Sequence, residues 1–261
     1  MLLLLAACGN GQGRDAEAVP PAPEASGGTV KLTVSAAASL TDALEEIKAA
    51  YESEHPDTLI SFNFGASGAL QQQIENGAPA DLFLSAADRN MRALVDAGLI
   101  EESKQTALLR NELVLVAASD DGAPIRNESD LTNPDIRTVA IGIPETVPAG
   151  SYAKEALVGQ NLWDSLQHKL VQAKDVRQVL QYVETGNADA GFVYKTDALT
   201  SDKAVIAATV DPSSYTPITY PIGIVKGSAH PDQAEALYDY LRSEKAMAVF
   251  AKYGFSAAGP S

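Results

Sequence analysis

Cysteine and histidine are scarce in this chain of 261 residues, which contains one Cys and three His. A single thiol, Cys8, excludes a disulfide bond within the chain. The histidines His55, His168 and His230 stand far apart and show none of the short spacings that metal-binding motifs use. The sequence therefore supports neither a disulfide-stapled fold nor a zinc-type metal site.

Basic residues are also few, because 19 Lys and Arg stand against 34 Asp and Glu and leave a formal net charge of −15 at pH 7. Such a charge repels nucleic-acid phosphates and anionic lipid headgroups over long range. We therefore expect no nucleic-acid partner and no electrostatic docking on a membrane. Surface charges more than about 8 Å away are largely screened at physiological salt, so a short-range site for an anion stays open.

Long hydrophobic runs are missing as well, and the run Leu2 to Ala7 is far shorter than the roughly 20 apolar residues of a membrane span. Leu5 to Gly9 resembles the lipobox of bacterial lipoproteins, in which cleavage before the cysteine follows its lipidation. The alternative is a chance apolar start with an inert thiol. The lipobox interpretation makes residues 1–8 a signal remnant with lipidation at Cys8, and the Pro- and Gly-containing residues 9–28 a flexible tether. The protein would then meet the membrane only through this anchor, in the periplasm or on the outer face of the cell membrane.

Short strands and helices alternate from Thr29 onward, as judged by apolar residues at every second or every third to fourth position. The predicted strands lie at residues 30–34, 60–64, 82–84, 113–117, 139–143, 191–194 and 218–225, and the predicted helices at residues 40–51, 70–74, 91–95, 152–157, 176–183 and 231–252. This order predicts an α/β fold with mostly parallel sheets covered by helices. The repetition of the order predicts two such units.

Two serines stand at turns from a strand to a helix, where open α/β sheets bind ligands. Ser39 occupies an expected N-cap position, with Asp42 three residues later in a variant of the capping box. Ser67 stands between Gly65 and Gly68, and glycines let a backbone approach a ligand closely. A cap and a tight turn would explain both serines without a ligand. Two similar turns in succession nevertheless favour an oxyanion site, because several neutral donors together hold a tetrahedral ion best.

Ser67 has a second interpretation, as the nucleophile of a hydrolase. The nucleophile elbow requires Gly-x-Ser-x-Gly, and the segment from Gly65 to Ala69 has alanine in place of the second glycine. His168 and His230 follow in the chain order that a catalytic triad needs, but neither lies in a recognisable catalytic motif. A serine hydrolase is therefore the alternative from a different class of protein.

Four segments carry a resemblance to a known family: Ala37–Thr41, Gly77–Phe83, Val147–Leu157 and Lys252–Phe255. Together they resemble the ModA family, the molybdate-binding proteins of bacterial ABC transporters, over nearly all of residues 30–255. The resemblance implies the type II periplasmic-binding-protein fold, in which two α/β lobes, each a mixed, mostly parallel sheet flanked by helices, enclose the ligand. It also implies a receptor without enzymatic activity or cofactor. Such a receptor delivers molybdate or tungstate to an ABC permease with its ATPase.

The same resemblance implies a set of ligand-binding residues. Ser39 and Ser67 match the two serines whose hydroxyls hold the oxyanion. Ala149 and Val176 match positions that donate backbone N–H groups, and Tyr194 matches a tyrosine whose hydroxyl completes the shell. These five residues would bind the metal as the molybdate oxyanion and not as a bare cation.

Three of these positions also have ordinary structural explanations. Ala149 follows Pro148 and could simply belong to a helix that begins with proline. Val176 follows Asp175, a predicted N-cap, so its side chain could be core while its N–H faces a ligand. Tyr194 could be a core aromatic with its hydroxyl at the surface, which is the commoner arrangement. Only their convergence with the two serines would make them a site.

The expected division places residues 29–110 and 219–261 in one lobe and residues 111–218 in the other, so the chain crosses between the lobes twice. Molybdate and sulfate are fully deprotonated dianions at neutral pH and only accept hydrogen bonds, whereas phosphate keeps a proton. Neutral donors therefore suit the former, with no carboxylate in contact. A receptor for sulfate or another oxyanion is the alternative within the same class, because a sequence does not give the size of a pocket. We expect a monomer.

Overall fold

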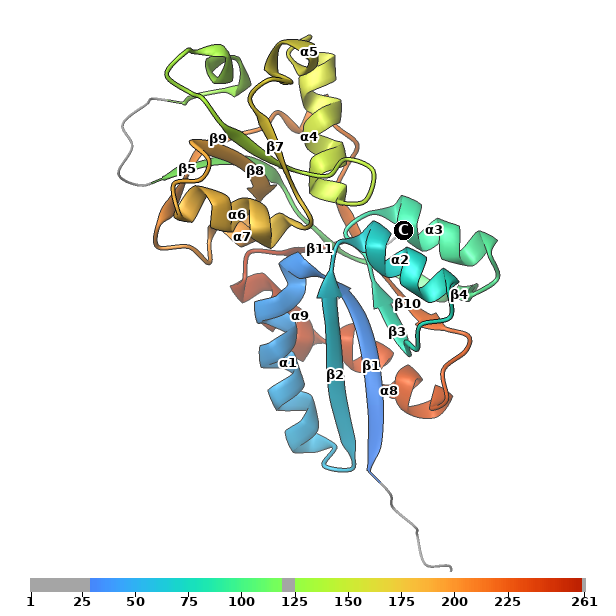
Figure 1. Ribbon diagram of the computed structural model, residues 1–261. Helices are drawn as coiled ribbons and strands as arrows, with labels where there is room; N and C mark the ends of the chain where they lie inside the picture. Colours follow the sequence, from blue (N-terminus) through green and yellow to red (C-terminus); the bar gives the residue numbers. More distant parts are fainter. Residues whose placement is uncertain (1–28, 119–124, 260–261) are drawn as a thin grey trace, which may run out of the picture.

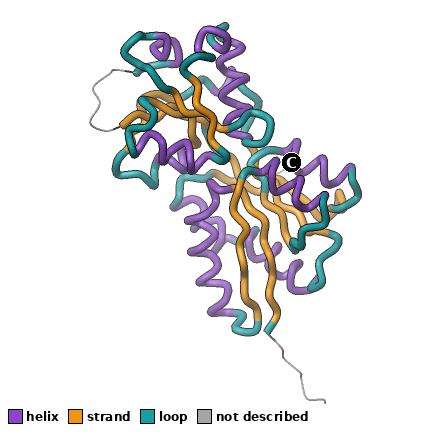
Figure 2. Tube along the Cα trace, viewed as in Figure 1, coloured by secondary structure: helices purple, strands orange, loops and turns teal. Residues whose placement is uncertain are grey.

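The structure is a computed structural model that describes residues 29–118 and 125–259. Its strands form two separate sheets, one of six strands and one of five, and helices cover both (Figure 1, Figure 2). The predicted lipobox, Cys8 and the tether lie outside the described residues. No helix within the described ranges is long and apolar enough to cross a membrane.

The unit built on the six-stranded sheet is called lobe I. Its strand order is β11-β4-β10-β3-β1-β2. The strands are β1 (Val30–Ala37), β2 (Thr58–Gly65), β3 (Leu82–Leu84), β4 (Ile100–Arg110), β10 (Thr219–Val225) and β11 (Ser256–Ala257). The helices are η1 (Ala38–Leu40), α1 (Thr41–Glu54), α2 (Ser67–Glu75), α3 (Asp88–Asp96), α8 (Pro231–Leu241) and α9 (Glu244–Lys252).

The unit built on the five-stranded sheet is called lobe II, with the strand order β7-β6-β8-β5-β9. The strands are β5 (Leu113–Ala118), β6 (Val139–Gly142), β7 (Leu170–Ala173), β8 (Ala190–Tyr194) and β9 (Ala204–Thr209). The helices are η2 (Glu128–Thr132), α4 (Pro148–Gly159), α5 (Trp163–Leu166), α6 (Val176–Glu184), α7 (Lys195–Ala198) and η3 (Pro212–Ser214).

Both sheets are mixed, which confirms the predicted fold class, but parallel pairs do not predominate. In lobe I, β1 runs parallel to β2 and β3, whereas β10 and β11 join through antiparallel pairs. In lobe II, β6 runs parallel to β7 and β8, whereas β5 pairs antiparallel with β8 and β9. The strands next to the passages between the lobes form antiparallel pairs, β4 with β10 in lobe I and β5 with β9 in lobe II.

The core explains why these segments form strands. In β1, Leu32, Val34 and Ala36 are fully buried, as their alternation predicts. The β5 residues Leu113 and Val114 are both fully buried, as an uninterrupted apolar strand in the middle of a sheet requires. Each such side chain contributes about 1.5 to 3 kcal/mol when it leaves water. Burial of β1 in lobe I and of β5 in lobe II thus anchors each sheet in its hydrophobic core.

The chain passes between the lobes twice, from β4 to β5 and from β9 to β10. The two passages lie side by side, because the Asn111 N–H donates to the Ile218 carbonyl at 3.3 Å. Lobe II is therefore inserted between two strands that are neighbours in the sheet of lobe I. The limits at residues 110 and 219 stay a prediction of how the chain divides into folding units.

One predicted element is wrong in its length. Residues 231–252 form two helices, α8 and α9, and not one long amphipathic helix. The break falls at Arg242 and Ser243, where the Ser243 hydroxyl accepts a hydrogen bond from the Ala246 N–H at 3.3 Å and caps the second helix. The break lets α9 turn back and pack against α1.

Candidate functional site

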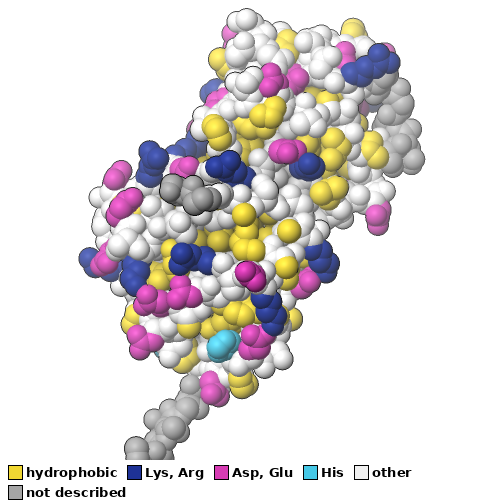
Figure 3. Space-filling model, turned by 180° about the vertical axis from the view of Figure 1, so that it is seen from behind, with side chains coloured by type: hydrophobic (Ala, Val, Ile, Leu, Met, Phe, Trp, Pro, Cys, Tyr) yellow, Lys and Arg dark blue, Asp and Glu magenta, His cyan; other side chains and the backbone are white. Residues whose placement is uncertain are grey.

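A small cavity lies between the two lobes. Twelve residues line it: Ala37, Ala38, Ser39, Gly65, Ala66, Ser67 and Ala86 from lobe I, and Val147, Pro148, Ala149, Val176 and Tyr194 from lobe II. All five sequence-predicted site residues are among them. Acidic and basic side chains lie over the outer surface (Figure 3), but none lines this cavity. The free volume is about 10 Å³, close to what one water molecule needs, so the lobes fit closely here.

Ser39 lies in η1, directly after β1, and its side chain is buried. It is not an N-cap, because the N-cap of α1 is Leu40 and the Ser39 hydroxyl bonds elsewhere. Its Oγ lies 2.9 Å from the Oη of Tyr220 in β10. The capping explanation of Ser39 is therefore wrong, since a single 3₁₀ turn separates the serine from the start of α1. The structure instead places its hydroxyl at the cavity.

Ser67 is the first residue of α2 and is completely buried. Its Oγ accepts a hydrogen bond from the Ala86 N–H at 2.9 Å. None of the chain's three histidines, all of which lie in described segments, lines the cavity: His55 ends α1, His168 precedes β7 and His230 precedes α8. A hydrolase needs a base within hydrogen-bond reach of its nucleophile. The surroundings of Ser67 provide no such base among the described residues that line the cavity.

Two helix N-termini of lobe II face the same cavity. Pro148 is the first residue of α4 and Ala149 the second, while Val176 is the first residue of α6. N–H groups in the first turn of a helix have no intrahelical acceptor. Asp175 caps α6 by accepting from the Gln178 N–H at 2.8 Å, as predicted. Val176 is a core residue at 4% exposure, which confirms the structural explanation of this position, and it also lines the cavity.

Two glycines hold α4 in this position. A Cβ atom at Gly150 would overlap the carbonyl oxygen of Gly142, the last residue of β6. A Cβ at Gly142 would in turn overlap the Val147 side chain. The absence of side chains therefore lets the first turn of α4 lie directly on the end of β6. This contact sets where Ala149 meets the cavity.

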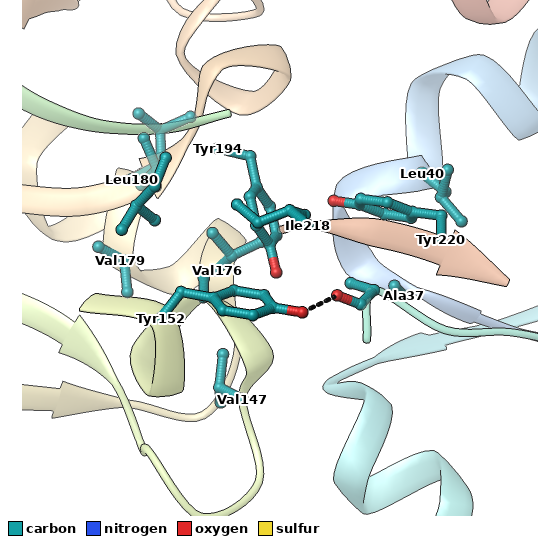
Figure 4. Packing of buried hydrophobic residues seen from close by; sticks show 14 of the residues in the cluster. Ala37, Leu40, Val147, Tyr152, Val176, Val179, Leu180, Tyr194, Ile218 and Tyr220 are labelled. Carbon is teal, nitrogen blue, oxygen red and sulfur yellow. Dashed lines mark hydrogen bonds between the residues drawn. The ribbon is translucent and has the colours of Figure 1, made fainter. Parts of the chain in front are cut away.

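Tyr194 ends β8, and its side chain is 1% exposed. Among the described residues its hydroxyl has no well-formed hydrogen bond besides its contact with the Tyr220 hydroxyl, although a buried hydroxyl normally finds a full partner. Burial raises the pKa of Tyr194 well above 10, so the hydroxyl keeps its proton at neutral pH. Figure 4 shows Tyr194 reaching from lobe II toward Tyr152 and the facing residues of lobe I. The cavity thus receives a buried donor that lacks a full partner.

Sequence reasoning missed the residues that support this lining. Tyr152 in α4 donates its hydroxyl to the Ala86 carbonyl across the lobe boundary at 3.2 Å (Figure 4). Tyr220 contacts Ser39, and the Asn111 Nδ2 donates to the Tyr220 Oη at 3.2 Å. Tyr152 and Tyr220 fall at ordinary apolar positions of a helix and a strand, so no local pattern distinguishes them. Asn111 stands in a passage between lobes, where polar residues are common.

Further contacts join the lobes around the cavity. Arg177 in α6 pairs with Asp42 in α1 at 2.5 Å and with the buried Asp197 in α7 at 2.6 Å. Burial raises the pKa of Asp197 to about 6, although Arg177 lowers it. On the other side of the cavity, the Thr146 carbonyl accepts from the Gly68 N–H at 2.9 Å. The described lobes therefore meet in a closed arrangement.

Metal chemistry has no support in this region. No group of three or more His, Cys, Asp or Glu side chains within the described ranges is arranged to hold a metal ion. The lining instead combines hydroxyls, helix N-termini and apolar surface. Such a set donates hydrogen bonds and suits a small ligand that only accepts them.

The family model for bacterial extracellular solute-binding proteins matches residues 32–256. The chain belongs to this family.

Two relatives show which members of the family this solute-binding protein resembles. It is 51% identical over 228 residues to YvgL of Bacillus subtilis, a candidate ABC transporter substrate-binding lipoprotein, covering 87% of each chain. It is 38% identical over 235 residues to the molybdate-binding protein ModA of Haemophilus influenzae, covering 88% of this chain and 91% of the relative. The solute-binding protein is thus ModA-like.

A solved structure supports the fold of the solute-binding protein. The periplasmic molybdate-binding protein of Azotobacter vinelandii superposes with a TM-score of 0.78 at 24% identity, covering 88% of this chain and all of the other. The predicted fold class and extracytoplasmic solute-binding role are therefore confirmed. Because the family is one of transport receptors and not of enzymes, the serine hydrolase alternative is wrong.

Proposed function

We propose that this solute-binding protein binds molybdate or tungstate in the cavity between the lobes. The proposed ligands are the hydroxyls of Ser39, Ser67 and Tyr194 and the backbone N–H groups of Ala149 and Val176, all at the cavity wall. The name and the similarity of the ModA relative support this choice of solute. Tungstate has the same charge and tetrahedral shape, so the same donors suit it.

One observation carries the proposal: among the described residues the buried Tyr194 hydroxyl has no well-formed hydrogen bond besides its contact with Tyr220, and Tyr194 lines the same cavity as two serines and two helix N-termini. An unpaired buried donor costs free energy, about 1 to 3 kcal/mol. A fully deprotonated tetrahedral oxyanion would supply the acceptor. No lining residue is a carboxylate, which is the arrangement that a dianion requires.

Hydrogen-bond energies agree with tight binding. A hydrogen bond to a charged group contributes about 1.5 to 3 kcal/mol, and the five residues proposed as donors all line the cavity. Desolvation of the ion and closure of the lobes offset part of this gain. Since the free volume in the closed arrangement is about 10 Å³, we infer that the lobes separate slightly to seat the ion.

The receptor would deliver its solute to an ABC permease that is driven by its own ATPase. We propose that lipidation at Cys8 holds the protein on the outer face of the cell membrane or in the periplasm, in keeping with the lipoprotein relative. The working form would be a monomer. The proposal includes no cofactor besides the bound oxyanion.

Calorimetric titration with molybdate, tungstate, sulfate and phosphate tests the choice of solute. We expect molybdate and tungstate to bind most tightly and phosphate most weakly, because phosphate keeps a proton that no lining acceptor receives. Preferred binding of sulfate would replace the proposed solute by the smaller dianion while keeping the site. Binding of none of the four would overturn the proposed function.

A Tyr194→Phe variant tests the proposed site itself. We expect molybdate affinity to fall by about 10- to 150-fold, since one hydrogen bond to the charged ligand is lost. Thermal stability without ligand should stay the same or rise, because the removed hydroxyl has no well-formed hydrogen bond among the described residues besides its contact with Tyr220. The matched control is Tyr51→Phe. Tyr51 is a buried tyrosine in α1 and does not line the cavity. Equal affinities of the two variants would remove Tyr194 from the site.

A further inference from the structure

One segment of lobe I reaches across the boundary between the lobes to the start of α4. This segment, Ala86–Arg89, leads from β3 into α3, and its first residue lines the cavity. The Arg89 Nη1 donates to the Ser151 Oγ at 2.7 Å, and its Nη2 donates to the Pro144 carbonyl at 3.4 Å. Both acceptors belong to lobe II and stand in the chain on either side of Ala149. Arg89 therefore bridges the lobes next to the cavity.

Arg89 carries a positive charge without a paired carboxylate in the described part of the chain. Its side chain is exposed, and none of the ion pairs among the described residues includes it. The neighbouring Asp88 and the exposed Glu145 of the facing loop are thus not paired with it. By contrast, Arg177 at the other side of the cavity is paired with two aspartates. The charge of Arg89 is therefore still available to a ligand.

This charge matters because the protein as a whole is acidic. A net charge of −15 repels an approaching dianion, and salt weakens this repulsion. A local cation at the boundary between the lobes offsets the repulsion where the ion must enter. Arg89 itself does not line the cavity, so it is not one of the proposed donors. Its charge acts on the ion before the ion reaches them.

Separation of the lobes changes what Arg89 contacts. Arg89 stays with lobe I, whereas Ser151 and Pro144 move away with lobe II. The guanidinium then has no protein acceptor left from these two contacts, and all five of its N–H groups are donors. Two parallel N–H groups of a guanidinium match two oxygens of a tetrahedral oxyanion, as in Arg–phosphate pairs. The ion and the two lobe II acceptors therefore compete for the same nitrogens.

We propose that Arg89 is a capture residue that attracts the oxyanion to the open cleft and then holds α4 against lobe I when the cleft closes. This inference rests on the proposed function. The two roles follow one another in time, because the nitrogens that contact the ion in the open arrangement bind Ser151 and Pro144 in the closed one. Arg89 should thus speed association through its charge and slow dissociation through its hydrogen bonds.

Stopped-flow fluorescence of Trp163 and the tyrosines, with molybdate at physiological ionic strength, measures both rates. Arg89→Gln should lower the association rate constant by about 2- to 3-fold, because a removed charge acts mainly within about 8 Å at this salt. The matched control is Arg92→Gln. Arg92 is exposed one turn later in α3, lines a separate hollow and forms no ion pair among the described residues. It should change the association rate by less than about 1.5-fold, because it lies farther from the boundary.

Two further variants separate the charge of Arg89 from its hydrogen bonds. Ser151→Ala removes one acceptor and leaves the charge, so it should raise the dissociation rate constant by about 1.5- to 5-fold and leave association unaltered. Arg89→Lys keeps the charge on one ammonium group, which does not reproduce the fork of a guanidinium. It should keep the parent's association rate and dissociate faster. Rescue of association by lysine but not by glutamine is a result that a merely structural role of Arg89 would not give.

The outcomes distinguish the inference from the proposed function. If the parent binds molybdate and Arg89→Gln associates as fast as Arg92→Gln, Arg89 is only part of the net charge, and the capture role is wrong while the function stands. Unchanged dissociation in both Ser151→Ala and Arg89→Lys would likewise overturn the inference. A parent that binds none of molybdate, tungstate and sulfate overturns the function and the inference together.

Discussion

The two lobes present different kinds of donor to the same cavity. Lobe I contributes the hydroxyls of Ser39, which is hydrogen-bonded to the Tyr220 hydroxyl, and of Ser67, which accepts from the Ala86 N–H. Lobe II contributes helix N-termini and Tyr194, whose positions are set by how the helices and β8 pack. Donors of the first kind are removed by changing one side chain. The Tyr194 hydroxyl of lobe II is removed in the same way, whereas the backbone N–H groups at its helix N-termini are removed only by moving the backbone.

The largest expected effect comes from moving the backbone of lobe II. In a Gly150→Ala variant the new methyl group overlaps the Gly142 carbonyl and pushes the start of α4 off β6. Overpacking of this kind costs about 1 to 3 kcal/mol or more of stability. Molybdate affinity should fall by more than about 100-fold, because at least one N–H donor and the cavity wall are displaced together.

Calorimetry and thermal melting measure the two effects, and Gly159→Ala is the matched control. Gly159 ends the same helix and a Cβ there meets no atom within 4 Å. If Gly150→Ala bound molybdate as tightly as Gly159→Ala, the position of α4 would not matter to the site.

Removal of one lobe I hydroxyl should have the next largest effect. We expect Ser39→Ala to lower molybdate affinity by about 10- to 150-fold, because one hydrogen bond to a charged ligand is lost. Titration calorimetry provides the measurement, with Ser35→Ala as control. Ser35 is also buried and lies on the preceding strand, but it does not line the cavity. An unchanged affinity would remove Ser39 from the site.

A smaller effect should follow from weakening the contact between lobes. Asp42→Asn removes one ion pair of Arg177, the one in which both side chains are partly exposed. Such a pair contributes about 0.2 to 1 kcal/mol, so molybdate affinity should fall by only about 1.5- to 5-fold, mainly through faster dissociation. Stopped-flow fluorescence of Trp163 would measure the rate. Salt should reduce the difference from the parent, because it screens the pair.

The control for that variant is Glu54→Gln, which removes the ion pair with Lys245 inside lobe I. It should leave the dissociation rate unaltered. Equal rates for Asp42→Asn and Glu54→Gln would show that the Arg177 bridge does not hold the lobes together around the ligand.

The smallest expected effect is that of alkaline pH. Burial raises the pKa of Tyr194 above its ordinary value of 10, which favours the protonated form. The hydroxyl therefore remains a donor as pH rises, and molybdate affinity should stay constant between about pH 7.5 and about pH 9.5. Calorimetry in buffers across this range is the measurement. A fall in affinity with a midpoint below 10 would show that the hydroxyl is not shielded as described.

Periodicity in the sequence predicted most of the fold that positions the site. The alternation in β1 and the helical spacing in α1 come from one buried face, so local sequence is enough to find them. It missed β4, where residues 101–103 are exposed and polar, and β9, where Val205 and Ile206 are exposed on an edge strand. These strands form because their backbones hydrogen-bond to neighbouring strands, and such pairing leaves no pattern of buried residues in the sequence.

The site could be predicted only in part, because some of its contacts join residues that are far apart in the sequence. Turn position pointed to Ser39 and Ser67, and family resemblance added Ala149, Val176 and Tyr194. The Tyr220 contact with Ser39 spans 181 residues of sequence. Such a pair arises from the β1–β3–β10 order of the sheet and from no local pattern. The residues that line the cavity were thus predictable in part, while their contacts with distant side chains were not.

The direction of β1 has a consequence for how the receptor is displayed. The strand begins at Val30, at the end of lobe I farthest from lobe II, and runs eight residues toward the cavity (Figure 1). At about 3.3 Å per residue the seven steps along the strand separate its two ends by roughly 23 Å. Any segment attached upstream of Val30 therefore joins the protein at the end of lobe I that lies farthest from lobe II, and it leaves the surroundings of the cavity clear (Figure 1).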